Sequence, residues 1–258
     1  MSQLIEAVII AVIQGITEWL PVSSSGHIIL AEKLLNYGNS LTFDVALHFG
    51  TLMSVFVYFG RDITDIIRDL LKLKFYTEKG KFGILLIIAT IPAGIAGFLF
   101  KDAFESIFSN LAIVALGFGI TGLILLIASL PITKQSRQIT KTKALIIGTS
   151  QILSLLPGVS RSGTTISISL LLGLKEKTAL KFSFLMSIPI IFGANIVTIG
   201  NQTLPSELIW ATLVSFIVGL ISLHLIYKYI LTSKTNLRYF AIYALLLALT
   251  IGIFLIVK

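Results

Sequence analysis

The sequence predicts an all-α polytopic membrane protein with six transmembrane helices, two re-entrant helical hairpins and two inverted-topology repeats. Its 258 residues are 55% hydrophobic and 12% charged, with a mean hydropathy of +0.97, whereas a soluble domain is about 25% charged. Two polar Ser/Gly-rich strings, LPVSSSG and LPGVSRSG, interrupt the apolar chain about half a chain apart. Duplicated interruptions in matching halves are the best sequence indication of a site inside a membrane.

The first predicted element is a helical hairpin over residues 4–35 with a polar tip. An apolar stretch, 4–20, runs into Leu20–His27, and a short apolar piece, 28–35, follows. The residue before a proline avoids helical geometry, so Leu20-Pro21 ends the first arm. A span needs roughly 20 apolar residues, so we expect this hairpin to enter the membrane and turn back.

Six longer apolar segments are expected to span the membrane, three after each hairpin. They are 44–60, 83–100 and 111–130 in the first half, and 182–200, 208–230 and 239–257 in the second. The first is the weakest, because Asp44 and His48 lie near its start. These two residues either orient the site from this span or cap a helix at the interface.

The second hairpin is predicted over residues 144–174, with Leu156–Thr165 at its tip. In lipid, such polar turns are tolerated only where protein buries them or where they line a wet cavity. One membrane domain, 1–258, therefore divides into a first repeat, 1–133, and a second, 140–258. Three spans is an odd number, so the second repeat is inverted relative to the first.

The basic residues predict which way the chain faces. If the first hairpin enters from one side, that side holds Lys33, Lys101 and Lys258, and sixteen other Lys and Arg residues lie opposite. The positive-inside rule then places the basic loops in the cytoplasm and both termini outside the plasma membrane. The two hairpin tips enter from opposite sides and meet within the bilayer.

Composition also excludes several classes of function. With no cysteine, the chain has no disulfide, thiolate nucleophile or Cys-ligated metal. The net charge of +8 is attributed to cytoplasmic loops near anionic headgroups, and no nucleic-acid partner is expected. Residues 1–30 lack a basic leader and a cleavage site, so no signal peptide is expected. A homodimer is left open.

Candidate chemistry in the first motif centres on Glu18 and His27. Gln14 and Glu18, four residues apart, share one helix face. A carboxylate at membrane depth is functional by default. The alternative is that Glu18 lies at the membrane interface and only extends its carboxylate into the headgroup region. Beside this glutamate and three serines, 23–25, His27 is a candidate general acid or phosphate contact. The serines alternatively serve as turn formers and helix caps.

The second motif places Arg161 at the start of an apolar helix, within Ser160–Thr165. Backbone N–H groups at a helix start attract anions, and the planar guanidinium matches phosphate oxygens. Arg161 needs an anion in the membrane, either Glu18 or a substrate. A purely structural Arg161–Glu18 bridge would leave the cluster of hydroxyls unexplained.

These motifs resemble those of the undecaprenyl-diphosphate phosphatase family, also called bacitracin-resistance proteins. One family signature matches Gln14–His27 and the other matches Pro157–Thr165. Phe182–Pro189 and the stretch around Gly50 also resemble the family, so the resemblance covers essentially the whole chain.

The resemblance implies hydrolysis of the terminal phosphate of a polyprenyl diphosphate, which recycles the lipid carrier for cell-wall polymers. The family's essential glutamate falls on Glu18, its proposed nucleophile on Ser24, its histidine on His27 and its arginine on Arg161. The implied phosphate-binding groups, including the family's threonine at Thr165, are Ser23, Ser25, Gly26, Ser160, Ser162, Gly163, Thr164 and Thr165. Ser24, His27 and water all remain open as the nucleophile.

The family is also associated with a divalent cation, Mg²⁺ or Ca²⁺. The implied ligand pair is Gln14 and Glu18, but Gln14 stands where some members have glutamate. A neutral amide is a poorer cation ligand than a carboxylate, so we expect the diphosphate to hold most of the ion. A lipid-phosphate flippase is the alternative function, because inverted repeats with broken helices also build transporters. An ion channel is a distant third.

Overall fold

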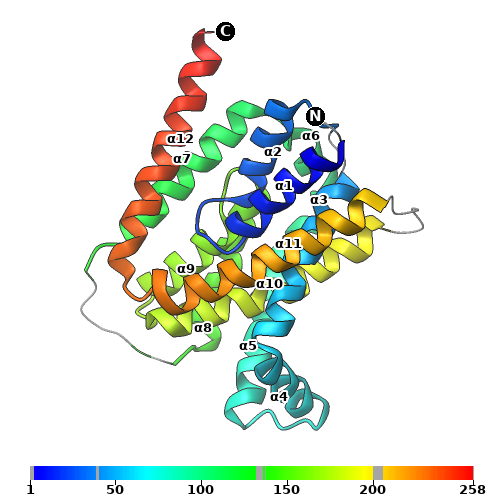
Figure 1. Ribbon diagram of the computed structural model, residues 1–258. Helices are drawn as coiled ribbons and strands as arrows, with labels where there is room; N and C mark the ends of the chain where they lie inside the picture. Colours follow the sequence, from blue (N-terminus) through cyan, green and yellow to red (C-terminus); the bar gives the residue numbers. More distant parts are fainter. Residues whose placement is uncertain (1–2, 39–40, 132–135, 137, 200–205, 258) are drawn as a thin grey trace.

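The computed structural model describes residues 3–38, 41–131, 136, 138–199 and 206–257. Within these ranges every regular element is helical, and an isolated bridge joins Ser136 to Leu174 (Figure 1). The all-α fold class is therefore confirmed.

The first half of the chain forms two short hairpin arms and then longer helices. They are α1 (Gln3–Thr17), α2 (Ser24–Leu35), α3 (Leu41–Tyr58), α4 (Gly60–Leu71), α5 (Glu78–Leu99), α6 (Lys101–Ile107) and α7 (Leu111–Ala128).

The second half repeats this order of short arms before long helices. It comprises α8 (Lys141–Ser150), the 3₁₀ turn Gln151–Leu155, α9 (Arg161–Leu171), α10 (Glu176–Ile199), α11 (Ser206–Leu225), the π turn Ile226–Ile230, the 3₁₀ turn Lys234–Asn236 and α12 (Leu237–Val257).

Five described helices are long and apolar enough to cross a membrane: α5, α7, α10, α11 with its π turn, and α12. The predicted first span, 44–60, meets the same test only as α3 and α4 together, and these are bent by 83°. The chain is thus a multi-pass membrane protein, and its described residues hold five candidate spans, or six if the bent pair counts as one.

The hairpin arms are short. With 15 residues, α1 is about 22 Å long at 1.5 Å per residue, whereas the hydrocarbon core is about 30 Å thick. Its partner α2 and both arms of the second hairpin, α8 and α9, are shorter still. Their lengths suit the predicted re-entrant path, which stays a prediction.

Each hairpin packs against a long helix of the other half through a glycine. A Cβ on Gly15 of α1 would lie 2.7 Å from Val218 Cβ of α11, and one on Gly148 of α8 would lie 2.1 Å from the Ala89 carbonyl oxygen of α5. Small residues of this kind let helix backbones approach closely in membranes. This exchange of partners between halves is compatible with inverted repeats, which stay a prediction.

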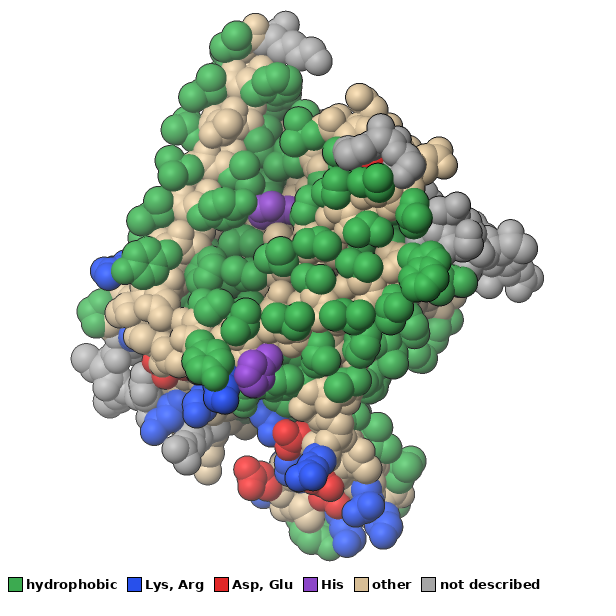
Figure 2. Space-filling model, in the orientation of Figure 1, with side chains coloured by type: hydrophobic (Ala, Val, Ile, Leu, Met, Phe, Trp, Pro, Cys, Tyr) green, Lys and Arg blue, Asp and Glu red, His purple; other side chains and the backbone are tan. Residues whose placement is uncertain are grey.

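On the face drawn in Figure 2, most charged side chains lie toward one end of the molecule. Figure 2 shows Lys, Arg, Asp and Glu side chains around α4 at the lower end, while the flanks above are largely apolar. The N-terminus of α1 and the C-terminus of α12 both lie at the opposite end (Figure 1). Of the basic residues in the topology prediction, Lys134, Arg137 and Lys258 lie outside the described residues.

Candidate active site

A cavity of about 280 Å³ opens where the turns of the two hairpins meet. The first motif contributes four polar lining residues and the second contributes two, and α3 and α10 add further polar side chains. These residues are Glu18, Ser23, Ser24, Ser25, Ser160, Arg161, Asp44, His48 and Asn195. Chain segments more than 130 residues apart in sequence therefore build one site.

Direct contacts hold the two hairpin turns together. The Ser162 hydroxyl donates to the Leu20 carbonyl oxygen at 3.0 Å. A Cβ on Gly163 would lie 3.2 Å from the Pro21 carbonyl oxygen, and one on Gly26 would lie 3.1 Å from Gly158 Cα. The predicted meeting of the tips is present in the structure.

Glu18 lies at the centre of the cavity's polar groups, with only 5% of its side chain exposed. Ser24 Oγ donates to Glu18 Oε2 at 2.7 Å, and Arg161 Nη2 donates to Glu18 Oε1 at 2.5 Å. Gln14 Nε2 donates to Oε2 at 3.2 Å. The structure thus joins three of the four predicted catalytic residues in one hydrogen-bonded cluster.

His48 of α3 also faces Glu18, although the motifs did not place it in the catalytic set. Its Nδ1 lies 2.8 Å from the Asp44 carbonyl oxygen, which can only accept, so Nδ1 carries a proton. Its Nε2 then points toward the site, 3.5 Å from Glu18 Oε2. The sequence signal was a histidine one turn after an aspartate at the start of the weakest span.

Two helices, α2 and α9, begin at the cavity, and a serine caps each. Ser23 Oγ accepts from the Gly26 N–H at 3.3 Å, and Ser160 Oγ accepts from the Gly163 N–H at 3.0 Å. Ser23 has φ of 70°, a left-handed conformation that is costly for a residue other than glycine. Helix N-termini favour anions, so both hairpins direct positive potential into one cavity.

Arg161 is fixed from several sides. Its guanidinium lies 5.5 Å from the centre of the Trp19 ring, and Nη1 donates to the Ser183 carbonyl oxygen at 3.4 Å. Thr165 Oγ1 donates to the Arg161 carbonyl oxygen at 2.8 Å and lies 2.6 Å from Ser183 Oγ. Thr165 therefore supports the start of α9 from behind the cavity.

Several predicted phosphate contacts lie outside the cavity lining. Gly26, Ser162 and Gly163 make the contact between the hairpins described above. Thr164 Oγ1 is buried and has no hydrogen-bond partner among the described residues. Of the predicted set, Ser23, Ser25 and Ser160 line the cavity.

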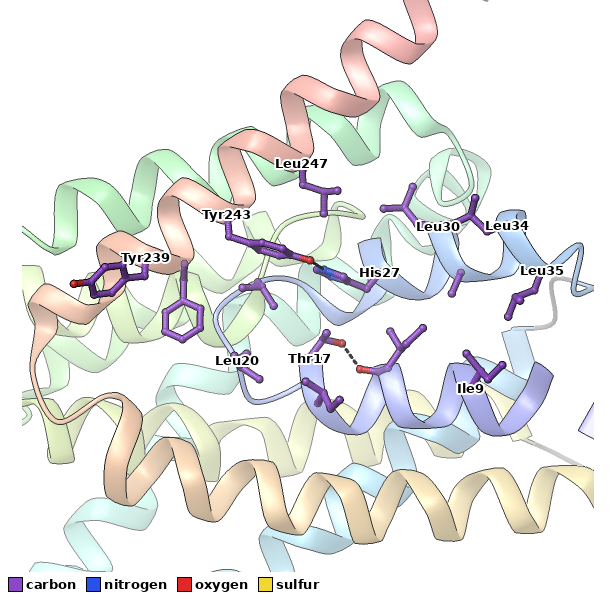
Figure 3. Close-up of a pocket in the computed structure, with 15 residues that line it drawn as sticks. Ile9, Thr17, Leu20, His27, Leu30, Leu34, Leu35, Tyr239, Tyr243 and Leu247 are labelled. Atoms are coloured by element: carbon purple, nitrogen blue, oxygen red, sulfur yellow. Dashed lines mark hydrogen bonds between the residues drawn. The ribbon is translucent and has the colours of Figure 1, made fainter. Parts of the chain in front are cut away.

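His27 points away from this cluster into a separate groove. Its Nδ1 lies 2.6 Å from the Ser23 carbonyl oxygen and therefore carries a proton, so Nε2 accepts from the Tyr243 hydroxyl at 2.7 Å. Figure 3 shows the two rings directed toward each other between α2 and α12. The groove, about 720 Å³, is lined mostly by apolar side chains, among them Ile9, Leu30 and Leu247.

The predicted cation pair, Gln14 and Glu18, offers few free ligand oxygens in this arrangement, and its binding of a cation stays a prediction. Both Glu18 oxygens already accept hydrogen bonds, which leaves Gln14 Oε1 as the one oxygen of the pair without a partner. Six or more oxygen ligands are usual for Mg²⁺ or Ca²⁺. Among the described residues, no three His, Cys, Asp or Glu side chains are arranged to hold a metal ion.

Comparison with known proteins identifies the family. Residues 7–250 match the model of the bacitracin resistance protein BacA family. The chain belongs to this family. An undecaprenyl-diphosphatase of Thermosipho melanesiensis is 40% identical over 245 residues, which cover 94% of this chain and 96% of the relative.

Two further relatives bear similar names. An undecaprenyl-diphosphatase of Methanococcus vannielii is 36% identical over 249 residues, covering 95% of this chain and 97% of its own. Undecaprenyl-diphosphatase 1 of Shouchella clausii is 35% identical over 268 residues, covering 97% and 96%. The family expected from the two motifs is confirmed.

Proposed function

We propose that the protein hydrolyses undecaprenyl diphosphate, or a similar polyprenyl diphosphate, to the monophosphate and inorganic phosphate. The observation that carries this proposal is the Ser24–Glu18–Arg161 cluster, in a cavity on which the N-termini of α2 and α9 converge. A hydroxyl, a base and a fixed cation are the groups that phosphoryl transfer uses. Family membership and the names of the relatives support the same reaction.

In the proposed first step, Ser24 Oγ attacks the terminal phosphorus. Glu18 Oε2, at 2.7 Å, takes the hydroxyl proton. The bond from the terminal phosphorus to the bridging oxygen breaks, and its electron pair leaves with the polyprenyl monophosphate. Ser24 is then a phosphoserine.

In the second step, water attacks the phosphoserine and the bond from phosphorus to Oγ breaks. The proton held by Glu18 returns to Ser24 Oγ, and inorganic phosphate leaves with the water oxygen. One residue thus serves as base in the first step and as acid in the second.

Arg161 is proposed to hold the terminal phosphate throughout. Its guanidinium lines the cavity while one nitrogen contacts Glu18. The remaining N–H groups and the two helix N-termini stabilise charge on the phosphoryl oxygens. Positioning and charge stabilisation account for most of the catalysis of such transfers.

His27 and the divalent cation have smaller places in this proposal. The His27 ring lies beside Tyr243 in the neighbouring groove, so its part in catalysis stays a prediction. We propose that Mg²⁺ or Ca²⁺ arrives on the diphosphate, because the Gln14–Glu18 pair has one unused oxygen. The steps above use only side chains of this chain and water.

We also propose that the cavity opens to the outer face of the plasma membrane and that the reaction recycles the carrier lipid for cell-wall synthesis. Support comes from the charged end of the molecule, which lies away from both termini (Figures 1 and 2) and matches the cytoplasmic side under the positive-inside rule.

The proposal is tested by phosphate release from undecaprenyl diphosphate, using purified protein in detergent. Ser24→Ala removes the attacking oxygen, and we expect a rate at least about 100-fold lower. A matched control is Ser106→Ala, since the exposed Ser106 hydroxyl only donates to the Ala103 carbonyl in α6. Mass spectrometry of acid-quenched protein should detect phosphate on Ser24.

Other outcomes would redirect the proposal. A near-normal rate for Ser24→Ala would remove the serine and favour attack by water. No phosphate from folded wild-type protein that still binds the lipid would favour the alternative, a lipid-phosphate flippase.

A further inference from the structure

A second polar cavity, of about 660 Å³, lies at the charged end of the molecule and shares no lining residue with the active site. Its wall includes the apolar rings of Phe82 and Tyr227. Four lysines surround them: Lys79 and Lys81 from the start of α5, and Lys177 and Lys181 from the start of α10. We call this cavity the basic pocket.

Asp62 of α4 fixes two of these lysines. It forms an ion pair with Lys79 and another with Lys181 at 2.8 Å, so α4 ties α5 to α10 beside the pocket. A single carboxylate thus serves two ammonium groups, and Glu78 is the one acidic residue in the pocket's lining. Four lysines against two carboxylates leave an excess of positive charge.

Lys81 and Lys177 are the unneutralised members. Both are exposed, and neither has an ion pair or hydrogen bond with any described residue. They come from the two different helices that frame the pocket. An anion between them would meet ammonium groups from two sides.

The position of the pocket relative to the membrane indicates what kind of anion it binds. The lysines of α5 directly precede the apolar run that begins at Phe82, so the pocket lies where α5 changes from charged to apolar sequence. This boundary is the level of lipid headgroups. Basic pockets between membrane helices are suited to anionic headgroups, and apolar walls suit the carbons next to them.

We propose that the basic pocket binds the phosphate headgroup of an anionic phospholipid from the leaflet at the charged end. Lys81 and Lys177 hold the headgroup phosphate, while Asp62 keeps Lys79 and Lys181 in place beside it. Phe82 and Tyr227 contact the glycerol and the first carbons of the chains. This binding is independent of the phosphatase reaction, because none of its residues lines the catalytic cavity.

The test measures binding of dihexanoyl-phosphatidylglycerol, with dihexanoyl-phosphatidylcholine for comparison, to the purified full-length protein. The pocket variant is Lys81→Ala/Lys177→Ala. Its matched control, Lys72→Ala/Lys74→Ala, removes two exposed lysines after α4 that do not line the pocket. We expect wild type and control to prefer phosphatidylglycerol. The pocket variant should bind this lipid at least about tenfold more weakly than wild type does.

A second variant distinguishes loss of charge from loss of the folded state. Lys81→Arg/Lys177→Arg keeps both charges and should retain binding. Equal losses in the two alanine pairs would overturn the proposal, because general surface charge would then explain the binding. Equal binding of the zwitterionic lipid, or displacement of phosphatidylglycerol by inorganic phosphate at the same concentration, would overturn it too.

Discussion

Four side chains direct a polar nitrogen or hydroxyl at one carboxylate, that of Glu18. Gln14, Ser24, His48 and Arg161 reach it from α1, α2, α3 and α9. A buried carboxylate is tolerated in a membrane protein only when such partners surround it. The proposed catalytic cluster and the stability of the molecule therefore depend on the same contacts.

We predict that Arg161→Ala is more destabilising than the double variant Glu18→Gln/Arg161→Ala. The single change leaves a buried charge unpaired, which costs about 3–5 kcal/mol, whereas the double change removes both charges. Thermal or denaturant unfolding in detergent measures the difference. If the losses of stability in Glu18→Gln and Arg161→Ala simply add up to the loss in the double variant, the two side chains are not coupled.

The motifs marked Glu18, Ser24 and Arg161 because the neighbouring residues in the sequence are enough to indicate their chemistry. They also marked His27, but the direction of its Nε2 depends on Tyr243, 216 residues later in the chain. For His48 the sequence left open whether it orients the site or caps a helix at the interface, and it reaches the site only because α3 packs beside α1, where Thr51 meets Gln14. Contacts between distant elements decide both histidines.

At the scale of elements, glycine on α7 sets how closely the second hairpin approaches. A Cβ on Gly117 would lie 2.2 Å from the Pro157 carbonyl oxygen, while one on Gly119 would have its nearest neighbour at 3.9 Å. On the same helix, Thr121 Oγ1 donates to the Gly158 carbonyl and accepts from the Ser160 N–H. Helix α7 is thus a backing surface for the motif that carries Arg161.

We predict that Gly117→Ala lowers stability by about 1–3 kcal/mol and reduces phosphate release, because the turn before α9 must move. Gly119→Ala should leave both nearly unchanged. Unfolding midpoints and turnover of the two variants give the comparison. If Gly117→Ala has the stability and turnover of the wild type, the turn before α9 can move without loss of either.

Helix composition predicted most elements but missed their irregularities. The apolar run 44–60 gave no sign that the chain turns by 83° between α3 and α4. Likewise, the first arm of the predicted hairpin 144–174 is a helix that continues as the 3₁₀ turn Gln151–Leu155. Both depend on packing against neighbours, which hydropathy does not report. The sequence did predict where α9 begins, because serine is a favourable N-cap residue and Ser160 caps this helix.

For the whole molecule, the proposed orientation can be tested directly because the chain has no cysteine. Helices α6 and α4 lie at opposite ends of the structure (Figure 1), and single cysteines can replace Ser106 in α6 and Lys72 directly after α4. In intact cells, we predict that a membrane-impermeant maleimide labels Ser106→Cys, and that it labels Lys72→Cys only after permeabilisation. The reverse pattern would invert the proposed topology.

The Glu18–Arg161 pair also constrains how the molecule is made. A ribosome delivers Glu18 to the membrane 143 residues before the arginine that neutralises it. Until then the first half holds a carboxylate whose permanent counter-charge has not been synthesised. Biogenesis must keep the first hairpin in contact with water until the second arrives, and a chain truncated before residue 161 should be a preferred target for membrane quality control.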